Sequence, residues 1–142
     1  MNTDFLKGKR ILIAEDDFVN QKLITHSLNV TGATFDIAGN GLEAIEMLKQ
    51  QPYDLILMDI NMPIMDGITA TKAILDHEQV FDKAHTPIIA LTANTLKGDK
   101  ERYLQMGMNG HLSKPVAFEE LRNLLERYIN IKPTVPSPLA IE

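Results

Sequence analysis

Polar side chains that could bind a cation or a phosphoryl group stand near the ends of short apolar runs in this sequence. They are the carboxylates Glu15, Asp16 and Asp59, the amide Asn61, the hydroxyl of Thr92 and the ammonium of Lys114. Carboxylates that converge within about 4–5 Å repel each other by roughly 4 kcal/mol per pair at an effective dielectric near 20. If the fold gathers these acids, the cluster needs a cation, and oxygen ligands without cysteine favour Mg²⁺ or Mn²⁺.

This set of residues suits phosphoryl transfer. An aspartate beside a divalent cation can act as a nucleophile and form an aspartyl phosphate. A hydroxyl and an ammonium could hold the other phosphoryl oxygens, because this chemistry depends mainly on positioning and charge neutralisation. The sequence has no Walker-type phosphate loop and no GxGxxG after its first apolar run, so nucleotide binding is not indicated.

Each residue also has an ordinary structural interpretation. Asp59 alone could cap a turn, and acids after a strand are often helix N-caps. Thr92 alone could bond to the backbone, and Lys114 alone could be a solvated surface charge. The joint occurrence of these groups is harder to explain by structure alone.

The apolar run Leu55–Met58 leads directly to Asp59. Four large apolar residues in succession cannot alternate between core and water, so they predict a strand covered on both faces of a parallel sheet. Asn61, Pro63 and Gly67 then break the run, and a loop begins. Ligand sites in open α/β sheets lie beyond the carboxyl ends of the strands, which is where Asp59 stands.

Further strands and a helix after each strand follow from the apolar spacing. The other strands are expected at Arg10–Ala14, Thr34–Ala38 near the sheet edge, Pro87–Leu91 and Gly110–Leu112. The helices are expected from a cap at Asp16 or Asp17 to Gly32, from the capping box Asn40–Glu43 to Pro52, from Asp66 to Leu75, from Asn94 or Thr95 to Met106, and over Phe118–Tyr128. We assign Val19, Leu23 and Ile24 to the core and Asp76–Thr86 to a loop.

Five β-α units with short connections predict a single α/β domain, a doubly wound five-stranded parallel sheet with helices on both faces. All carboxyl ends of the strands then share one edge, which gathers the polar residues named above. The domain is expected to cover residues 9–130. Residues 131–142 contain three prolines and little periodicity, so they are interpreted as a linker or tail.

Composition narrows the function classes. The 142 residues carry 14 basic and 19 acidic side chains, a net charge of -5, which argues against a nucleic-acid partner. Cysteine is absent, so disulfides, thiolate metal sites and thiol nucleophiles are excluded. The amino terminus has no apolar signal core and no run approaches the length of a membrane span, so a cytoplasmic location without membrane contact is expected.

Four motifs resemble the receiver domain of two-component response regulators. They are ILIAEDDFVNQ, LILMDINMPIMDG, IIALTAN and HLSKP, and the resemblance covers about Lys9 to Ile129. It implies the flavodoxin-like receiver fold with strand order 2-1-3-4-5. Glu15 in place of the Asp common in stand-alone regulators, together with EDxxVNQ, MDINMP and ALTAN, is most similar to receivers attached to hybrid sensor histidine kinases.

The resemblance implies a role for each matching residue. Asp59 would be the phosphoacceptor, Asp16 a direct Mg²⁺ ligand, Glu15 a ligand through water and the Asn61 carbonyl a further ligand. Thr92 and Lys114 would each hold a phosphoryl oxygen, and the Lys114–Pro115 peptide bond would be cis. His111 occupies the switch position, where many relatives carry Tyr or Phe; it would turn inward as Thr92 moves, or it is a partly exposed histidine with no switching role.

The implied function is transfer of a phosphoryl group from a phosphohistidine to Asp59, in two-component signalling or a phosphorelay. The donor would be a histidine kinase or a histidine-phosphotransfer domain, docked on the helix that begins near Phe18. The domain would catalyse its own phosphorylation and slow hydrolysis. Two alternatives are a receiver-like interaction module that is never phosphorylated and a hydrolase with an aspartyl phosphate. The hydrolase class expects an acid two residues after the nucleophile, where this chain has Asn61.

Overall fold

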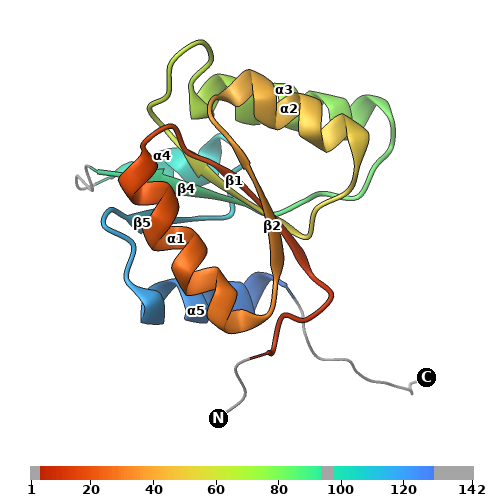
Figure 1. Cartoon of the computed structure of the whole chain (residues 1–142). Coiled ribbons are helices and arrows are strands. Elements are labelled where there is room, and N and C mark those ends of the chain that lie inside the picture. The colour runs from red at the N-terminus through yellow and green to blue at the C-terminus, as the bar shows by residue number, and fades with distance from the viewer. Residues whose placement is uncertain (1–3, 94–97, 130–142) are drawn as a thin grey trace.

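The computed structural model describes residues 4–93 and 98–129 and contains a five-stranded parallel sheet in the order β2-β1-β3-β4-β5 (Figure 1). The strands are β1 (Arg10–Ala14), β2 (Thr34–Ala38), β3 (Leu55–Asp59), β4 (Ile88–Thr92) and β5 (Gly110–Ser113). The predicted fold class and strand order are therefore confirmed. As expected from its alternating sequence, β2 is an outer strand of the sheet.

The helices form a layer on each face of this sheet (Figure 1). They are α1 (Phe18–Thr31), α2 (Gly41–Gln50), α3 (Gly67–Val80), α4 (Asp99–Gln105) and α5 (Phe118–Tyr128). Successive residues of β3 supply the two layers, since side chains alternate along a strand. Leu55 and Leu57 pack with Leu28 of α1 and Leu125 of α5, while Ile56 and Met58 pack with the α2, α3 and α4 residues Ala44, Ile74 and Tyr103.

Short polar side chains cap the first two helices. Asp17 accepts a hydrogen bond from the Asn20 amide at 2.9 Å, so Asp17, rather than Asp16, is the N-cap of α1. The predicted capping box at Asn40 has one altered contact, because the Glu43 carboxylate accepts from the Gly39 amide at 2.7 Å and not from that of Asn40. Capping by Asp17 leaves the Asp16 side chain available to the site.

The predicted end of the third helix was wrong. Helix α3 continues to Val80, so the first part of Asp76–Thr86 is helical and not a loop. Glu78 occupies the inner position one turn after Ile74 and is only 9% exposed, so a carboxylate stands where the sequence pattern expects an apolar residue. The predicted N-cap of the fourth helix, at Asn94 or Thr95, lies outside the described residues, and α4 is described from Asp99 with Gly98 at its N-cap.

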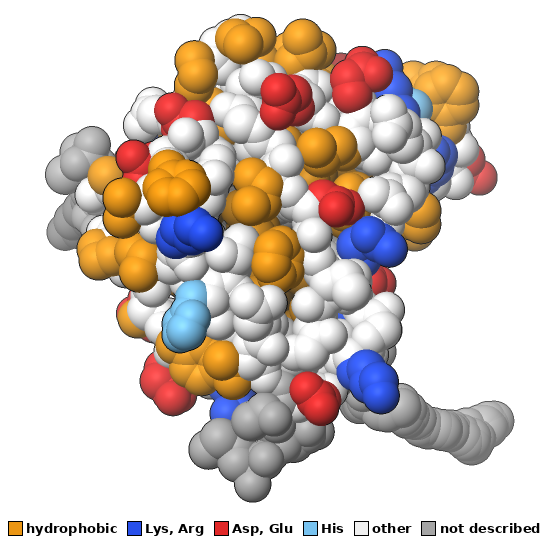
Figure 2. All heavy atoms as spheres, in the orientation of Figure 1, with side chains coloured by type: hydrophobic (Ala, Val, Ile, Leu, Met, Phe, Trp, Pro, Cys, Tyr) orange, Lys and Arg blue, Asp and Glu red, His pale blue; other side chains and the backbone are white. Residues whose placement is uncertain are grey.

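The assignment of Val19 and Leu23 to the core was also wrong. Their exposed fractions are 63% and 46%, whereas Ile24 and Leu28 are buried as expected. Phe18 is 67% exposed as well, and Figure 2 shows hydrophobic side chains at the surface over α1. Only one stripe of this helix faces the sheet, so the remaining apolar residues form an exposed face.

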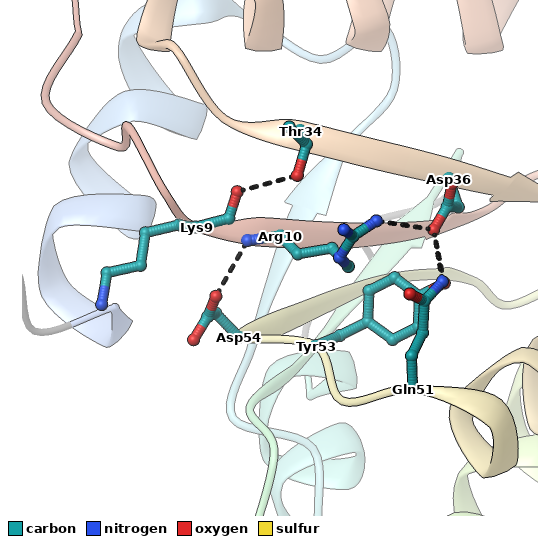
Figure 3. A network of polar contacts seen from close by, with 7 residues as sticks. All are labelled: Lys9, Arg10, Thr34, Asp36, Gln51, Tyr53 and Asp54. Carbon is teal, nitrogen blue, oxygen red and sulfur yellow. Dashed lines mark hydrogen bonds and ion pairs between the residues drawn. The ribbon is translucent and has the colours of Figure 1, made fainter.

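A polar network joins β1, β2 and the segment before β3 (Figure 3). The Asp36 Oδ2 atom accepts from the Tyr53 hydroxyl at 2.6 Å and from Gln51 at 3.0 Å, and it pairs with Arg10 at 3.4 Å. The Asp54 carboxylate accepts from the Arg10 amide at 2.8 Å. Burial and the hydrogen bond to Asp36 raise the pKa of Tyr53 to about 12. The network joins the start of β1, the middle of β2 and the segment that leads into β3.

Tyr53→Phe is expected to lower the free energy of unfolding by about 1 kcal/mol, because Asp36 loses its shortest hydrogen bond but keeps two other partners. Urea denaturation at pH 7 measures the change. A phenolate absorbance titration should lose its component near pH 12 in the variant. Equal stability of the two proteins would show that this hydrogen bond contributes nothing.

Two remaining predictions concern membrane contact and the end of the domain. No helix among the described residues combines the length and apolarity needed to cross a membrane. The predicted linker at residues 131–142 lies outside the described residues.

Candidate functional site

The carboxyl ends of β1 and β3 and the residue that follows β5 meet at one point. The Lys114 ammonium lies 2.8 Å from Asp59 Oδ2 and 3.0 Å from Glu15 Oε1. Glu15 is fully buried, Asp59 is 2% exposed and Thr92 is 3% exposed. The predicted convergence of these strand ends is therefore present, and it brings two buried carboxylates onto one ammonium group.

Asp59 is held by the loop that follows it. The Asn61 amide donates to Asp59 Oδ1 at 3.2 Å, and the Gly67 amide donates to the Ile60 carbonyl at 3.0 Å. Gly67 also packs so closely that a Cβ atom there would overlap the Asp59 carbonyl oxygen. The loop thus returns onto the end of β3, and this contact between backbones fixes the position of the Asp59 side chain.

Glu15 is anchored through both its side chain and its carbonyl group. Its Oε2 atom accepts from the Asp17 amide at 3.0 Å, and its carbonyl accepts from the Gln21 side chain at 2.6 Å. Its Oε1 atom is buried and is paired with the Lys114 ammonium at 3.0 Å. Burial raises the pKa of Glu15, and the negative charge of Asp59 adds to the rise, although the Asp17 amide and Lys114 oppose it.

Lys114 is the cation of this cluster. Its amide donates to the Thr92 carbonyl at 2.9 Å, which ties the segment after β5 to the end of β4. Burial alone would lower the pKa of the Lys114 ammonium, but hydrogen bonds and charges from Asp59 and Glu15 outweigh burial and raise it. The predicted cis peptide bond between Lys114 and Pro115 is confirmed.

The three acids fit a divalent cation. Glu15, Asp16 and Asp59 each offer a carboxylate oxygen, and the three oxygens lie within 4.8 Å of one another. Asp16 is exposed while the other two are buried, so the group opens toward solvent on one side. Carboxylate oxygens this close repel one another, and a hard cation that they coordinate would offset the repulsion.

His111 lies on β5, two residues after Asn109, and is half-buried. Its ring centroid is 6.4 Å from that of Tyr103 on α4. The single conformation described here is compatible with both interpretations given above, so the switching role stays a prediction.

Two contributors were not recognised from the sequence. Gln21 stands in the EDDFVNQ motif, but nothing in its spacing indicates that it bonds to the Glu15 carbonyl. Ile64 has a φ of 70°, and the Met65 amide donates to the Pro63 carbonyl at 2.7 Å across it. These features define a γ-turn, which is strained for a β-branched residue. Ile64 is 80% exposed, so its side chain buries little surface to offset the strain.

Ile64→Gly is expected to raise the free energy of unfolding by about 1 kcal/mol, because glycine adopts positive φ without a Cβ clash. Chemical denaturation at pH 7 measures the change. Val30→Gly is a useful control of opposite sign, since Val30 is 41% exposed within α1 and glycine weakens helix interiors. A loss of stability in Ile64→Gly would contradict the strain.

Comparisons with known proteins give a consistent result. A family model described as "Response regulator receiver domain" matches residues 11–126. The chain is 41% identical over 133 residues to hybrid signal transduction histidine kinase B of Dictyostelium discoideum, covering 87% of this chain and 7% of the relative. It is 43% identical to the histidine-protein kinase BarA of Escherichia coli, covering 83% of this chain and 12% of the relative. The chain thus spans only a small part of these relatives.

Solved structures agree. A receiver domain of a sensor histidine kinase from Pseudomonas aeruginosa, with a magnesium ion coordinated in its active site cleft, has a TM-score of 0.77 and 42% identity, covering 87% of this chain and 98% of that one. A Saccharomyces cerevisiae receiver domain, solved with a histidine phosphotransfer signaling protein, has a TM-score of 0.81 and 32% identity, covering 87% and 90%.

Proposed function

We propose, on the premise that this chain belongs to the response regulator receiver domain family, that Asp59 accepts a phosphoryl group from a phosphohistidine donor in a Mg²⁺-dependent reaction. The observation that carries the proposal is the buried Asp59 carboxylate, paired at 2.8 Å with Lys114 and grouped with the acids Glu15 and Asp16. The receiver domain covers residues 9–130 and acts in the cytoplasm, in two-component signalling or a phosphorelay, within a hybrid kinase or as a separate regulator.

In the reaction, an Asp59 carboxylate oxygen forms a bond to phosphorus while the bond from phosphorus to the donor's imidazole nitrogen breaks and its electron pair stays on that nitrogen. Asp16, Asp59 and the Asn61 carbonyl would hold the metal, with Glu15 acting through water. The bound cation would neutralise charge on the phosphoryl oxygens. Lys114 holds one of these oxygens and Thr92 another. His111 would turn inward as Thr92 moves and so signal the phosphorylated state; the alternative is a half-buried histidine with no switching role.

Incubation with acetyl phosphate and Mg²⁺, followed by a Phos-tag gel, tests the proposal. The wild-type protein should give one slower band, and the band should be absent with EDTA. Asp59→Asn is the matched control because it keeps the shape of the side chain and removes the nucleophile. A wild-type protein without the slower band would instead support an interaction module that is never phosphorylated, and rapid phosphate release from small phosphoesters would support a hydrolase.

Mg²⁺ at tenfold to a hundredfold over its dissociation constant is expected to add about 1.4–2.7 kcal/mol to the free energy of unfolding. The gain arises because the folded state gathers the acids and the unfolded state does not. Thermal melts with Mg²⁺ and with EDTA measure it, and Asp16→Asn should reduce it. Superimposable melts would argue against the metal site.

The exposed apolar face of α1 is proposed as the docking surface for the donor. Phe18, Val19 and Leu23 form this face, and α1 begins two residues after Asp16, so the face adjoins the site. A donor whose histidine reaches a buried Asp59 must cover this neighbourhood. Phe18→Ser should slow phosphotransfer from a phosphorylated histidine-phosphotransfer protein and leave labelling by acetyl phosphate unchanged. Equal slowing with both donors would place the defect in the site rather than in docking.

A further inference from the structure

His85 lies between two hydrogen-bond acceptors near the amino-terminal ends of β4 and β5, whereas the site lies at the carboxyl ends of the strands. Its Nδ1 atom is 2.9 Å from Oε1 of Glu78 on α3, and its Nε2 atom is 2.8 Å from Oδ1 of Asn109, which directly precedes β5. The side chain of His85 thus connects the end of α3 to the entry of β5 from the loop that joins α3 to β4.

The acceptor role of Asn109 is fixed by a second contact. The Ile88 amide, which can only donate, lies 2.9 Å from the same Asn109 Oδ1 atom, so the amide oxygen and not its nitrogen must point at this position. A neutral imidazole has a single N–H group and can satisfy only one of the two acceptors. The geometry is therefore that of an imidazolium donating from both ring nitrogens.

Glu78 gives the imidazolium a counter-charge. Its side chain is 11% exposed, and its other oxygen, Oε2, accepts from the Thr86 amide at 2.8 Å. Within residues 4–93 and 98–129, the ion pair that His85 makes is with Glu78. Other titratable groups also lie near His85. Asp82 is on the same loop, and the Tyr128 hydroxyl donates to the Asn109 carbonyl at 2.7 Å. A hollow of about 540 Å³ is lined by His85 and Glu78 together with Lys49, Tyr53, Asp54, His77 and Lys83.

We propose that His85 forms a pH-dependent link between α3 and the start of β5. The link is closed when the ring is an imidazolium and opens when the ring loses a proton. Opening removes one of the two hydrogen bonds and leaves the Glu78 carboxylate without its cation. The entries of β4 and β5 are then held together less firmly, and these strands lead to Thr92 and Lys114 at the other edge.

The direction of the pH dependence follows from the contacts. Burial alone would lower the pKa of His85, but the hydrogen bonds to Glu78 and Asn109 and the charge of Glu78 outweigh burial and raise it above 6.5. A raised pKa in the folded state means that the stabilisation is fully present below the unfolded pKa. It is lost as the pH rises through the folded pKa.

Nitrogen-15 NMR of the imidazole ring is the direct experiment on the full chain, with the His85 signals assigned from their absence in His85→Gln. Both ring nitrogens should be protonated at pH 6, and the fitted pKa should exceed 6.5. Glu78→Gln should lower this pKa, and Asn109→Asp should raise it further, because a carboxylate replaces the amide oxygen. A purely structural contact would not give opposite shifts in these two variants.

Hydrogen exchange reports the opening. Protection of the Ile88 amide, corrected for intrinsic exchange, should fall as the pH rises through the titration of His85. The expected decrease is about tenfold for each pH unit by which the His85 pKa in the folded protein exceeds the ordinary pKa of histidine. His85→Gln should abolish this pH dependence, and His26→Gln, which removes an exposed histidine of α1, should not. A His85 pKa at or below 6.5, or a single protonated nitrogen at pH 6, would overturn the proposal even if Glu78→Gln fails to fold.

Discussion

Lys114→Met is expected to lower the free energy of unfolding by about 3–5 kcal/mol at pH 7 in EDTA, since removing one partner of a buried ion pair leaves uncompensated charge. Here two carboxylates lose the same ammonium, and Glu15 and Asp59 are both almost completely buried. Methionine keeps the apolar stem, so the change isolates the charge. Urea denaturation measures the loss, and the variant should also label far more slowly with acetyl phosphate.

The loss of unfolding free energy in Lys114→Met should be smaller in two conditions. Because burial already raises the pKa of Glu15 above 4.5, the folded variant takes up a proton before the unfolded chain does as the pH falls, and protonation removes the repulsion. Saturating Mg²⁺ should restore part of the lost stability by replacing the cation. Lys49→Met is the matched control, because Lys49 is exposed and pairs weakly with Glu46 at 3.8 Å. Similar losses in the two variants would contradict this account of Lys114.

Gly67→Ala is expected to destabilise the domain by about 3 kcal/mol or more, although alanine is the better helix former. The new Cβ would overlap the Asp59 carbonyl oxygen, and it would lie 2.9 Å from the Asp59 carbonyl carbon and 3.0 Å from Met58 Cγ. Two of these neighbours are backbone atoms of a buried central strand, which cannot move aside. The variant should therefore also displace Asp59 and lose phosphorylation.

Gly39→Ala provides the comparison. A Cβ at Gly39 would meet only the Glu43 carboxylate, at 3.5 Å, and its φ is not positive. Its stability should change by no more than about 0.5 kcal/mol. Circular dichroism and urea denaturation of both variants measure the contrast, and a gain of stability in Gly67→Ala would show that the loop after Asp59 can yield.

The buried strands and the shared position of the site residues could both be predicted from the sequence, because both are indicated by apolar runs that end in a polar residue. Continuous apolar runs such as Leu55–Met58 identify strands buried on both faces, and the polar residue at the end of each run marks the shared edge. Asp59 and Lys114 could thus be placed together from the chain alone. Their separation of 2.8 Å could not, because it depends on how the segment after β5 returns to the end of β4.

Other features depend on tertiary contacts that carry no local signal. Val19 and Leu23 fit the helical period, but the apolar pattern does not show which stripe of α1 the sheet can cover. Glu78 interrupts the apolar spacing of α3 because its burial is compensated by His85, which lies seven residues later. The φ of Ile64 was equally hidden, since a β-branched residue gives no indication of a left-handed conformation.

The polar network around Asp36 has a consequence for how copies of this domain behave at high concentration. Strand β2 ends the sheet and so presents unpaired backbone groups, which could recruit a strand from another molecule and start aggregation. A carboxylate in the middle of this five-residue strand, held in place by Arg10, Gln51 and Tyr53, makes such a junction unfavourable because an added strand would have to desolvate it. The same contacts that join β1, β2 and the segment before β3 thereby protect this edge strand against intermolecular β-pairing.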